Sequence, residues 1–226
     1  MCLYLCGDCM DYLPLYPDNY FDLAVVDPPY FSGPEKRGYY GRRVSSIGVQ
    51  RVYEPAPEWD VPGRDYFDEL MRVSRHQIIW GCNYFDYHFG SGRIIWDKCN
   101  GGSSFSDCEI AFCSLHDSVR LIRYMWNGMF QGKSIEEGHI QQGNKKLNEK
   151  RIHPTQKPAN LYRWIVQRYI KTGWTVLDTH AGSASSLIAY CEAEVQFTAF
   201  EKDQHMYELS VERFKTETNR FLLKGG

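Results

Sequence analysis

The tetrapeptide Asp27-Pro28-Pro29-Tyr30 combines groups that can hold a polar, planar substrate. The Asp27 carboxylate and the Pro28 carbonyl are hydrogen-bond acceptors, and the Tyr30 ring can stack on a planar partner. The two prolines fix the backbone φ angle and carry no N–H groups that would compete with these acceptors. In isolation the tetrapeptide is equally typical of a proline-rich turn, so the surrounding sequence decides between the two readings.

A second candidate is the stretch Asp178-Thr179-His180-Ala181-Gly182-Ser183. Its small residues allow a ligand to approach the backbone, and a helix that starts there offers unpaired N–H groups. Many strand-to-helix turns share these features for packing reasons alone. Further along, Glu201 in Phe200-Glu201-Lys202-Asp203 could accept hydrogen bonds from ribose hydroxyls, or could simply cap a surface turn.

Histidines and cysteines near these motifs are weaker candidates. His180 could act as a general base, although a ring at a strand end more commonly packs, and His153 is interpreted as structural in the same way. Cys6-Gly7-Asp8-Cys9 has metal-ligand spacing but no second pair of ligands at comparable spacing. We therefore expect no metal site.

The pattern of apolar residues places both motifs at the ends of strands. Phe21–Val26 is a near-continuous apolar run, which predicts a strand buried on both faces that ends at Asp27. The other expected strands are Leu3–Cys6, Gln77–Trp80, Arg93–Trp96, Glu109–Ser114, Val119–Trp126, Thr175–Asp178 and Val195–Phe200, and the expected helices are residues 66–73, Leu161–Tyr169, Ser183–Cys191 and His205–Thr216. Alternating strands and helices predict an α/β fold with a doubly wound, mostly parallel sheet. Ligands of such sheets bind outside the carboxyl ends of the strands, where both motifs lie.

Bulk properties restrict the class of protein. With 226 residues, 43% hydrophobic and 24% charged, the chain is expected to form one soluble globular domain over residues 1–226. The first residues lack the basic flank of a signal peptide and no run approaches membrane-spanning length, so we expect a cytoplasmic protein with no membrane partner. Its eight cysteines are then expected to be reduced thiols.

Two polar stretches interrupt the expected elements. Residues 31–62 and 127–152 have no apolar period and are interpreted as a mobile loop and a short insert. Because the formal net charge is -2, any basic surface for nucleic acid has to be local.

Taken together, the motifs resemble the amino-group DNA methyltransferases. The resemblance covers nearly the whole chain and rests on Asp27–Tyr30, on His153-Pro154-Thr155-Gln156-Lys157-Pro158, on Val176–Asp178 with Ala181–Ser183, and on Gly7-Asp8, Asp22-Leu23, Trp80–Phe85 and Ile95–Lys98. The catalytic motif precedes the cofactor motif, which is the order of the permuted beta class. The resemblance implies a circularly permuted, Rossmann-like fold that uses S-adenosylmethionine.

The permutation makes a topological prediction. Thr175–Asp178 and Val195–Phe200 correspond to the first two strands of the unpermuted sheet, so Leu3–Cys6 should supply the third. We therefore expect Leu3–Cys6 beside Val195–Phe200 and the two ends of the chain close together.

The implied chemistry is methylation of the N6 amine of adenine. If Asp27 and Pro28 accept its two N–H bonds, negative charge faces the nitrogen as it becomes cationic. The amine is inaccessible in a duplex, so the nucleotide is flipped out, with Tyr30 and Phe31 expected to hold the base.

The resemblance also implies cofactor contacts. They are Asp8 and Cys9 near the adenine, Glu201 and Lys202 at the ribose, Asp178, Ala181, Gly182 and Ser183 at the methionine part, Thr155, Gln156 and Lys157 at its carboxylate, with Asp27 and Pro28 lining the same pocket. The chain departs from the family at His180, where an aromatic residue is usual, and at Ala184, where a second glycine is usual.

Double-stranded DNA is the expected partner. Lys36, Arg37, Arg42 and Arg43 could bind phosphates above the active site, although a solvated loop would have the same composition. Residues 127–152 stand where the family carries target recognition. Because they are few, either they read few bases or a second copy of the chain completes the grip as a homodimer. The resemblance also allows a cognate restriction nuclease.

Three other functions stay open. Cytosine-N4 methyltransferases share the amine chemistry but usually carry serine where this chain has Asp27. Enzymes that methylate protein glutamine use Asn-Pro-Pro-Tyr, against which the permuted order argues. A degenerate, non-catalytic DNA-binding subunit is suggested by His180 and Ala184 and opposed by the intact Asp27–Tyr30.

Overall fold

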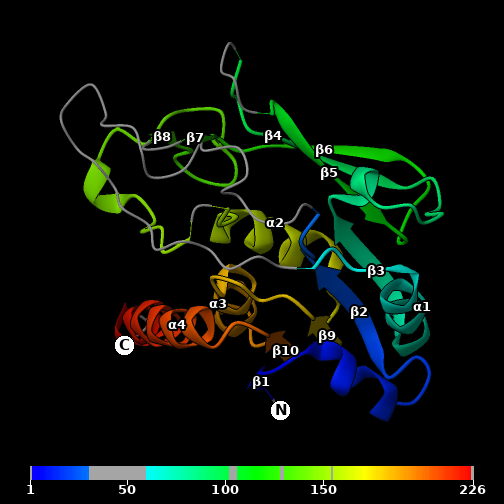
Figure 1. The fold of residues 1–226 in the computed structure, drawn as a ribbon. Helices are drawn as coiled ribbons and strands as arrows, with labels where there is room; N and C mark the ends of the chain where they lie inside the picture. Colours follow the sequence, from blue (N-terminus) through cyan, green and yellow to red (C-terminus); the bar gives the residue numbers. More distant parts are fainter. Residues whose placement is uncertain (1, 31–59, 102–105, 128–129, 154, 225–226) are drawn as a thin grey trace.

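A central sheet organises the molecule. The structure is a computed structural model that describes residues 2–30, 60–101, 106–127, 130–153 and 155–224. Its main sheet has the strand order β1-β10-β9-β2-β3-β5-β4-β6 (Figure 1). The strands are β1 (Leu3–Cys6), β2 (Phe21–Val26), β3 (Ser74–Trp80), β4 (Arg93–Asp97), β5 (Cys108–Cys113), β6 (Val119–Arg123), β9 (Thr175–Asp178) and β10 (Gln196–Glu201).

Most neighbouring strands in this sheet run parallel. The pairs from β1 through β10, β9 and β2 to β3 are all parallel, as is the pair of β4 with β6. Only β5 runs against its neighbours β3 and β4 within this sheet. The predicted doubly wound, mostly parallel α/β sheet is therefore confirmed.

The N-terminal strand lies beside the C-terminal one, as expected from the order of the motifs. In β1, Leu5 is the register partner of Phe200 in β10. The C-terminal helix α4 (Gln204–Lys224) packs on β1, where the Tyr4 hydroxyl lies 2.6 Å from that of Ser210. The two ends of the chain thus complete one layered unit.

Helices cover both faces of the sheet. The helices α2 (Ala159–Tyr169), α3 (Ser185–Glu192) and α4 lie on one face, and α1 (Arg64–Val73) lies on the other (Figure 1). The short 3₁₀ helices η1 (Cys9–Asp11) and η2 (Leu13–Leu15) join the core on the α1 face, whereas η4 (Cys82–Tyr84) follows β3.

Strand β2 shows why the sequence folds in this way. Leu23 and Val25 belong to the core under α2 and α3. Phe21, Ala24 and Val26 belong to the core under α1. All five are at most 1% exposed, which confirms the prediction of a strand buried on both faces.

The expected strand Val119–Trp126 is wrong in its second half. Strand β6 ends at Arg123, and β7 (Trp126–Asn127) instead pairs with β8 (Phe130–Gln131). The Met125 N–H donates to the carbonyl of Gly138 at 2.8 Å, which turns the chain out of the main sheet. The rest of the 127–152 segment is mostly irregular and contains the 3₁₀ helix η5 (Lys145–Leu147).

The boundaries of helices α3 and α4 also differ from the prediction. Helix α3 begins at Ser185 and not at Ser183, because Ala184 adopts a left-handed φ of 60°. Helix α4 extends to Lys224, beyond the expected end at Thr216.

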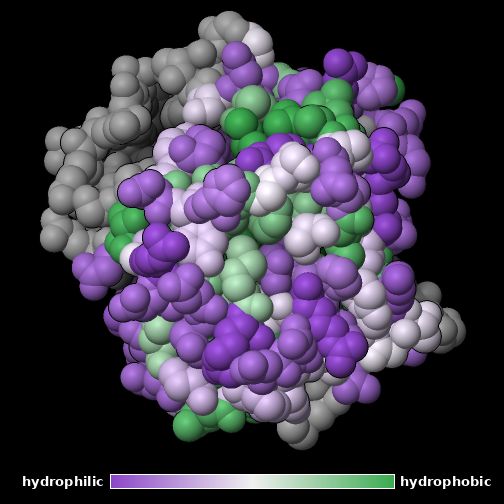
Figure 2. All heavy atoms as spheres, turned by 90° about the vertical axis from the view of Figure 1, so that its right-hand side faces the viewer, coloured by the Kyte–Doolittle hydropathy of each residue, from purple (hydrophilic) through white to green (hydrophobic). Residues whose placement is uncertain are grey.

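The surface on the side of α1 and β6 is mainly hydrophilic. Figure 2 shows this side, with hydrophobic side chains gathered towards its upper edge. On β6, Val119 is 64% exposed and Leu121 is 53% exposed.

Within the described residues, no helix is long and apolar enough to cross a membrane.

A buried ion pair joins α4 to the rest of the fold. Arg213 Nη2 lies 2.5 Å from Glu149 Oε1, and these side chains are only 5% and 17% exposed. Arg213 also donates to the Ser183 carbonyl, while Glu149 Oε2 accepts the N–H of Ala159 at the start of α2 at 2.9 Å. This pair fixes the end of the 127–152 segment, α2 and the turn before α3 relative to one another.

We predict that Arg213→Met lowers the free energy of unfolding by about 3 kcal/mol, because it leaves the Glu149 charge buried without its partner. Urea denaturation measures the loss. The double variant with Glu149→Gln should recover part of it, and the exposed Arg168→Met should change stability by less than about 0.5 kcal/mol. An Arg213→Met loss no larger than that of Arg168→Met would contradict this role.

Candidate active site

The carboxyl ends of the parallel strands bring the predicted motifs to one edge of the sheet. Asp8 follows β1, Glu201 ends β10 and Asp178 ends β9. Asp27 follows β2 and Gly81 follows β3. Backbone bonds from Gly7 N to Glu201 O and from Ala181 N to Phe200 O, both 2.9 Å, tie neighbouring parts of this edge.

Asp27 has two carboxylate oxygens in different environments. Oδ2 lies 2.5 Å from the Lys157 ammonium. Oδ1 is buried and has no hydrogen-bond partner among the described residues. A buried acceptor without a partner costs free energy, so Oδ1 is a position at which a donor from a substrate would be favourable.

Lys157 belongs to a buried chain of alternating charges. Its Nζ atom also lies 3.0 Å from Oε2 of Glu109 in β5. Glu109 Oε1 in turn lies 2.5 Å from Nζ of Lys98, which follows β4. The side chains are 4% exposed for Lys157, 19% for Glu109 and 15% for Lys98, so water screens these charges little.

The two carboxylates respond differently to this arrangement. Burial raises the pKa of Asp27, and Lys157 opposes that rise. Burial acts in the same direction on Glu109, but Lys157 and Lys98 together lower its pKa to about 2. The neighbouring Asp27 and Glu109 carboxylates raise the pKa of Lys157 well above its usual value against the effect of burial. At neutral pH, Lys157 is therefore an ammonium ion.

Tyr30 has a well-defined position above Gly81. Its ring stacks on that of Tyr84, with centroids 4.7 Å apart and planes inclined by 8°. The ring of Phe85 meets it edge-on at 6.4 Å. Gly81 has a φ of +69°, and a Cβ atom there would lie 2.3 Å from the Tyr30 ring. Only glycine allows this close approach.

The turn after β9 is held by Asp178. Its Oδ2 accepts the Ser186 hydroxyl at 2.5 Å, and its Oδ1 accepts the N–H of His180 at 3.1 Å. Gly182 and Ala184 both adopt a positive φ, so Ala184 takes the conformation that glycine prefers. Burial raises the pKa of Asp178 to about 7.

Glu201 caps backbone groups in the structure. Its Oε2 accepts the N–H of Gly182 at 2.8 Å and its Oε1 accepts that of Asp203 at 2.9 Å. Asp8 Oδ2 forms an ion pair with Lys202 at 2.8 Å. Glu201 therefore caps backbone N–H groups, which was the alternative to a ribose contact. The remaining lone pairs of its carboxylate could accept hydrogen bonds from a ribose. The Cys9 thiol packs in the core, where burial raises its pKa to about 12.

His180 packs as a ring. It meets Tyr66 edge-on, with centroids 5.4 Å apart, and its Nδ1 lies 2.9 Å from the Thr179 hydroxyl. The Thr179 hydroxyl lies 2.7 Å from that of Tyr66. Burial lowers the pKa of His180 to about 4, so the imidazole is neutral at physiological pH. These contacts favour the packing interpretation over the general base.

The stretch before Lys157 serves partly as scaffold. Gln156 is buried, its Oε1 accepts the N–H of Ile152 at 2.9 Å and its Nε2 donates to Glu149 at 2.9 Å. Its side chain is thus occupied with the end of the 127–152 segment. Thr155 is exposed, and its hydroxyl lies 2.8 Å from His153 Nδ1. Thr155, Gln156 and Lys157 were all expected at the cofactor carboxylate. Of these three residues, Lys157 is the one whose side chain contacts Asp27.

Sequence reasoning assigned no role to several residues of this site. Glu109 is a charged residue in an otherwise apolar strand, which was a usable signal. Lys98 and Tyr84 lie in segments that resemble the family, but nothing in the sequence placed them beside Lys157 or Tyr30. The expected base-holding and DNA-binding residues Phe31, Lys36, Arg37, Arg42 and Arg43 lie outside the described residues.

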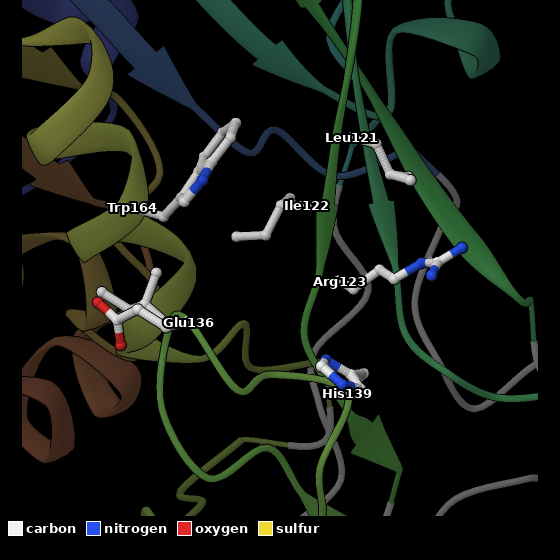
Figure 3. Close-up of a pocket in the computed structure, with 7 residues that line it drawn as sticks. Leu121, Ile122, Arg123, Glu136, His139 and Trp164 are labelled. Carbon is white, nitrogen blue, oxygen red and sulfur yellow. The ribbon is translucent and has the colours of Figure 1, made fainter.

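A cavity of about 470 Å³ lies elsewhere, between β6, α2 and the 127–152 segment (Figure 3). Its lining residues are Leu121, Ile122, Arg123, Ile135, Glu136, His139 and Trp164. It shares no residue with the Asp27 site.

We predict that Gly81→Ala destabilises the protein by at least about 2 kcal/mol, from backbone strain and displacement of Tyr30. Gly173→Ala is the matched control, because Gly173 also has a positive φ but its added Cβ would meet nothing within 4 Å. It should cost only the strain, about 1 kcal/mol. Urea denaturation of both compares them, and equal losses would show that the Tyr30 contact has no energetic effect.

We also predict a pH-dependent effect of Asp178→Asn. The folded-state pKa of Asp178 is raised from 3.8 to about 7, so its contribution to stability is present at low pH and is lost as pH rises through 7. Above pH 7 the variant should be more stable than the wild type by roughly 2–4 kcal/mol, and the difference should shrink towards pH 4. Thermal unfolding from pH 4 to 8 measures this. Parallel stability curves for the two proteins would exclude it.

Parts of the sequence are similar to known DNA methylases. Residues 121–212 match the model of the family N6_N4_Mtase, described as DNA methylase. The type II methyltransferase M2.MboI of Moraxella bovis is 24% identical over 237 residues, which span 92% of this chain and 85% of that protein.

Solved structures show the same fold. The M1.HpyAVI–SAM complex superposes with a TM-score of 0.54 at 15% identity and covers 94% of this chain and all (100%) of that one. The cytosine-N4-specific PvuII DNA methyltransferase superposes with a TM-score of 0.52 at 15% identity, with coverage of 97% and 92%. These superpositions show that the chain shares the Rossmann-like α/β fold of those enzymes.

Proposed function

We propose that this chain is an S-adenosylmethionine-dependent DNA methyltransferase that modifies the N6 amine of a flipped-out adenine at specific sites. The observation that carries the proposal is the buried Oδ1 of Asp27, which has no hydrogen-bond partner among the described residues and lies three residues before Tyr30 in the chain. The family match and the relatives named above supply the class of reaction.

The proposed roles at the base follow from these two residues. Asp27 Oδ1 and the Pro28 carbonyl accept the two N–H bonds of the amine, so negative charge faces the nitrogen as it gains positive charge. Pro28 and Pro29 add no N–H donor that would compete. Tyr30 stacks on the base, and for this its own stack on Tyr84 has to open or shift.

The residues at the sheet edge fit the proposed cofactor. When bound, S-adenosylmethionine supplies an electrophilic methyl group on a sulfonium sulfur. Asp8 and Glu201 present carboxylates suited to adenine and ribose donors, with Cys9 and Lys202 beside them. Asp178 holds the turn that contains Ala181, Gly182 and Ser183, where backbone can approach the methionine part. Lys157, with Thr155 and Gln156 before it, is placed at the junction of this turn with Asp27, since its carbonyl accepts the Ser185 hydroxyl at 2.7 Å.

Adenine is favoured over cytosine by one residue. Cytosine-N4 enzymes usually carry serine where this chain has Asp27, and a carboxylate supplies more negative charge than a hydroxyl. Cytosine-N4 methylation remains the second candidate, because the cytosine-N4-specific PvuII enzyme shares the fold. The amine chemistry is the same for both bases.

The class and the partners are part of the proposal. The strand order, with β1 beside β10, supports assignment to the permuted beta class. Double-stranded DNA is the proposed substrate, with Phe31 at the base and Lys36, Arg37, Arg42 and Arg43 as phosphate contacts. Residues 127–152 are proposed to recognise the target sequence, with the second copy of the chain in a homodimer supplying further contacts to the DNA.

The function is tested by incubating the protein with DNA and S-adenosylmethionine and mapping modified bases on single molecules. The wild type should yield N6-methyladenine in one sequence context, and Asp27→Ala should lower the rate by at least about 100-fold. The exposed Asp86→Ala is the matched control and should retain activity. Mass spectrometry of the nucleosides separates the two bases. N4-methylcytosine would move the assignment to the second candidate, and no modified base would refute both.

A further inference from the structure

The charge chain Lys98–Glu109–Lys157–Asp27 is more extensive than one ion pair at an active site requires. Asp27 Oδ2 and Lys157 Nζ are 2.5 Å apart, Lys157 and Glu109 Oε2 are 3.0 Å apart, and Glu109 Oε1 and Lys98 are 2.5 Å apart. The two lysines and two carboxylates alternate, so their formal charges cancel. Glu109 and Lys98 come from β5 and the end of β4, outside the motifs that hold the proposed substrates.

We propose that Glu109 and Lys98 are positioning residues for methyl transfer: they hold the Lys157 ammonium on Oδ2 of Asp27, which keeps Oδ1 available for the target amine. This inference rests on the proposed function. It assigns Glu109 and Lys98 no direct contact with base or cofactor.

Lys157 can hold Asp27 in one orientation only if its own position is fixed. The ammonium lies 5.8 Å from the centroid of the Tyr30 ring and 5.7 Å from that of Trp80, so aromatic faces restrict it on two sides. Glu109 supplies the second anionic contact. Without Glu109, Asp27 would be the one anionic contact left to this long side chain among the contacts described above, and the ammonium could draw the carboxylate away from the substrate.

The number of charges decides what each substitution does. With Asp27 counted in, removing the Glu109 charge leaves the chain with a net charge of about +1, and removing the Lys98 charge leaves it with about −1. Removing both restores balance around the Asp27–Lys157 pair. A purely structural role would produce losses without this dependence on sign.

Other titratable groups face the same centre. Burial, and the Asp27 charge, raise the pKa of Asp178 to about 7, so this group titrates within the measured range in the wild type and in every variant, and the test rests on the differences between them. Tyr30, and Tyr162 on α2, face Lys157, and burial raises the pKa of both phenols well above their usual value. They stay protonated over the accessible pH range. The pKa of Asp27 is raised by Glu109 and lowered by Lys98, so the two neighbours act on it in opposite directions.

The test compares Glu109→Gln, Lys98→Met and the double variant by kcat and KM for DNA methylation from pH 6 to 10. Glu109→Gln should lower kcat at pH 7.5 by about 10- to 100-fold with little change in KM, because the reacting geometry is loosened. Its pH profile should shift to lower pH by about one unit, since both Asp27 and Lys157 lose a negative neighbour. Lys98→Met should shift the profile to higher pH, and the double variant should return towards the wild type.

A second measurement does not depend on activity. The ¹³Cε resonance of Lys157 reports its protonation, and in the protein without cofactor or DNA it should titrate at lower pH in Glu109→Gln than in the wild type. Adding Lys98→Met should reverse that change. Glu212→Gln and Lys215→Met on the exposed face of α4 are matched controls and should alter neither profile nor resonance.

The outcomes separate the inference from the function on which it rests. If the wild type methylates DNA but both single variants shift the pH profile in the same direction, or the double variant is no better than Glu109→Gln, the positioning role is wrong. If the wild type modifies no DNA, the proposed function fails, while the Lys157 titration still decides whether Glu109 and Lys98 control its charge. Circular dichroism identifies a variant that does not fold, in which case the other single variant decides by the direction of its shift.

Discussion

Partial burial of the Asp27 carboxylate, whose side chain is 22% exposed, is the constraint on which the site depends. A charge removed from water is costly unless a partner of opposite charge meets it with good geometry. Lys157 provides that partner at 2.5 Å, Lys157 also contacts Glu109, and Glu109 in turn contacts Lys98. One oxygen of Asp27 is satisfied by the protein and the other is left unpaired. The unpaired oxygen is a position at which a donor from a substrate would be favourable.

Parts of the chain that are far apart in sequence have to meet to satisfy this constraint. Asp27 follows β2, Glu109 lies in β5 and Lys157 directly precedes α2. A parallel sheet makes this possible because the carboxyl ends of its strands share one edge. The buried Arg213–Glu149 pair fixes α2 and the turn before α3 from the other side. The positions of the proposed catalytic carboxylate and of the expected cofactor turn thus depend on the same packing.

The sequence predicted the fold well where the local pattern was strong. The apolar side chains of Phe21–Val26 point alternately into two cores, one on each face of the sheet. Such a continuous apolar run is typical of a parallel strand that is buried on both faces. Prediction failed where long-range contacts decide, as at β6, which ends when Met125 pairs with Gly138. The Tyr30–Tyr84 stack and the Lys157–Glu109 pair each join residues more than 40 positions apart, and no local pattern reports such contacts. The positive φ angles of Gly81 and Ala184 are likewise not evident from the sequence and appear only in the structure.

The most direct test of the account is a crystal structure of the protein with a duplex that contains its target site and with S-adenosylhomocysteine. The account predicts a flipped-out base whose exocyclic nitrogen lies about 2.7–3.2 Å from Oδ1 of Asp27, with Lys157 still on Oδ2. The Tyr30 ring should lie against the face of that base. A base amine bound to other acceptors, or Oδ1 engaged by Lys157 in the complex, would contradict it.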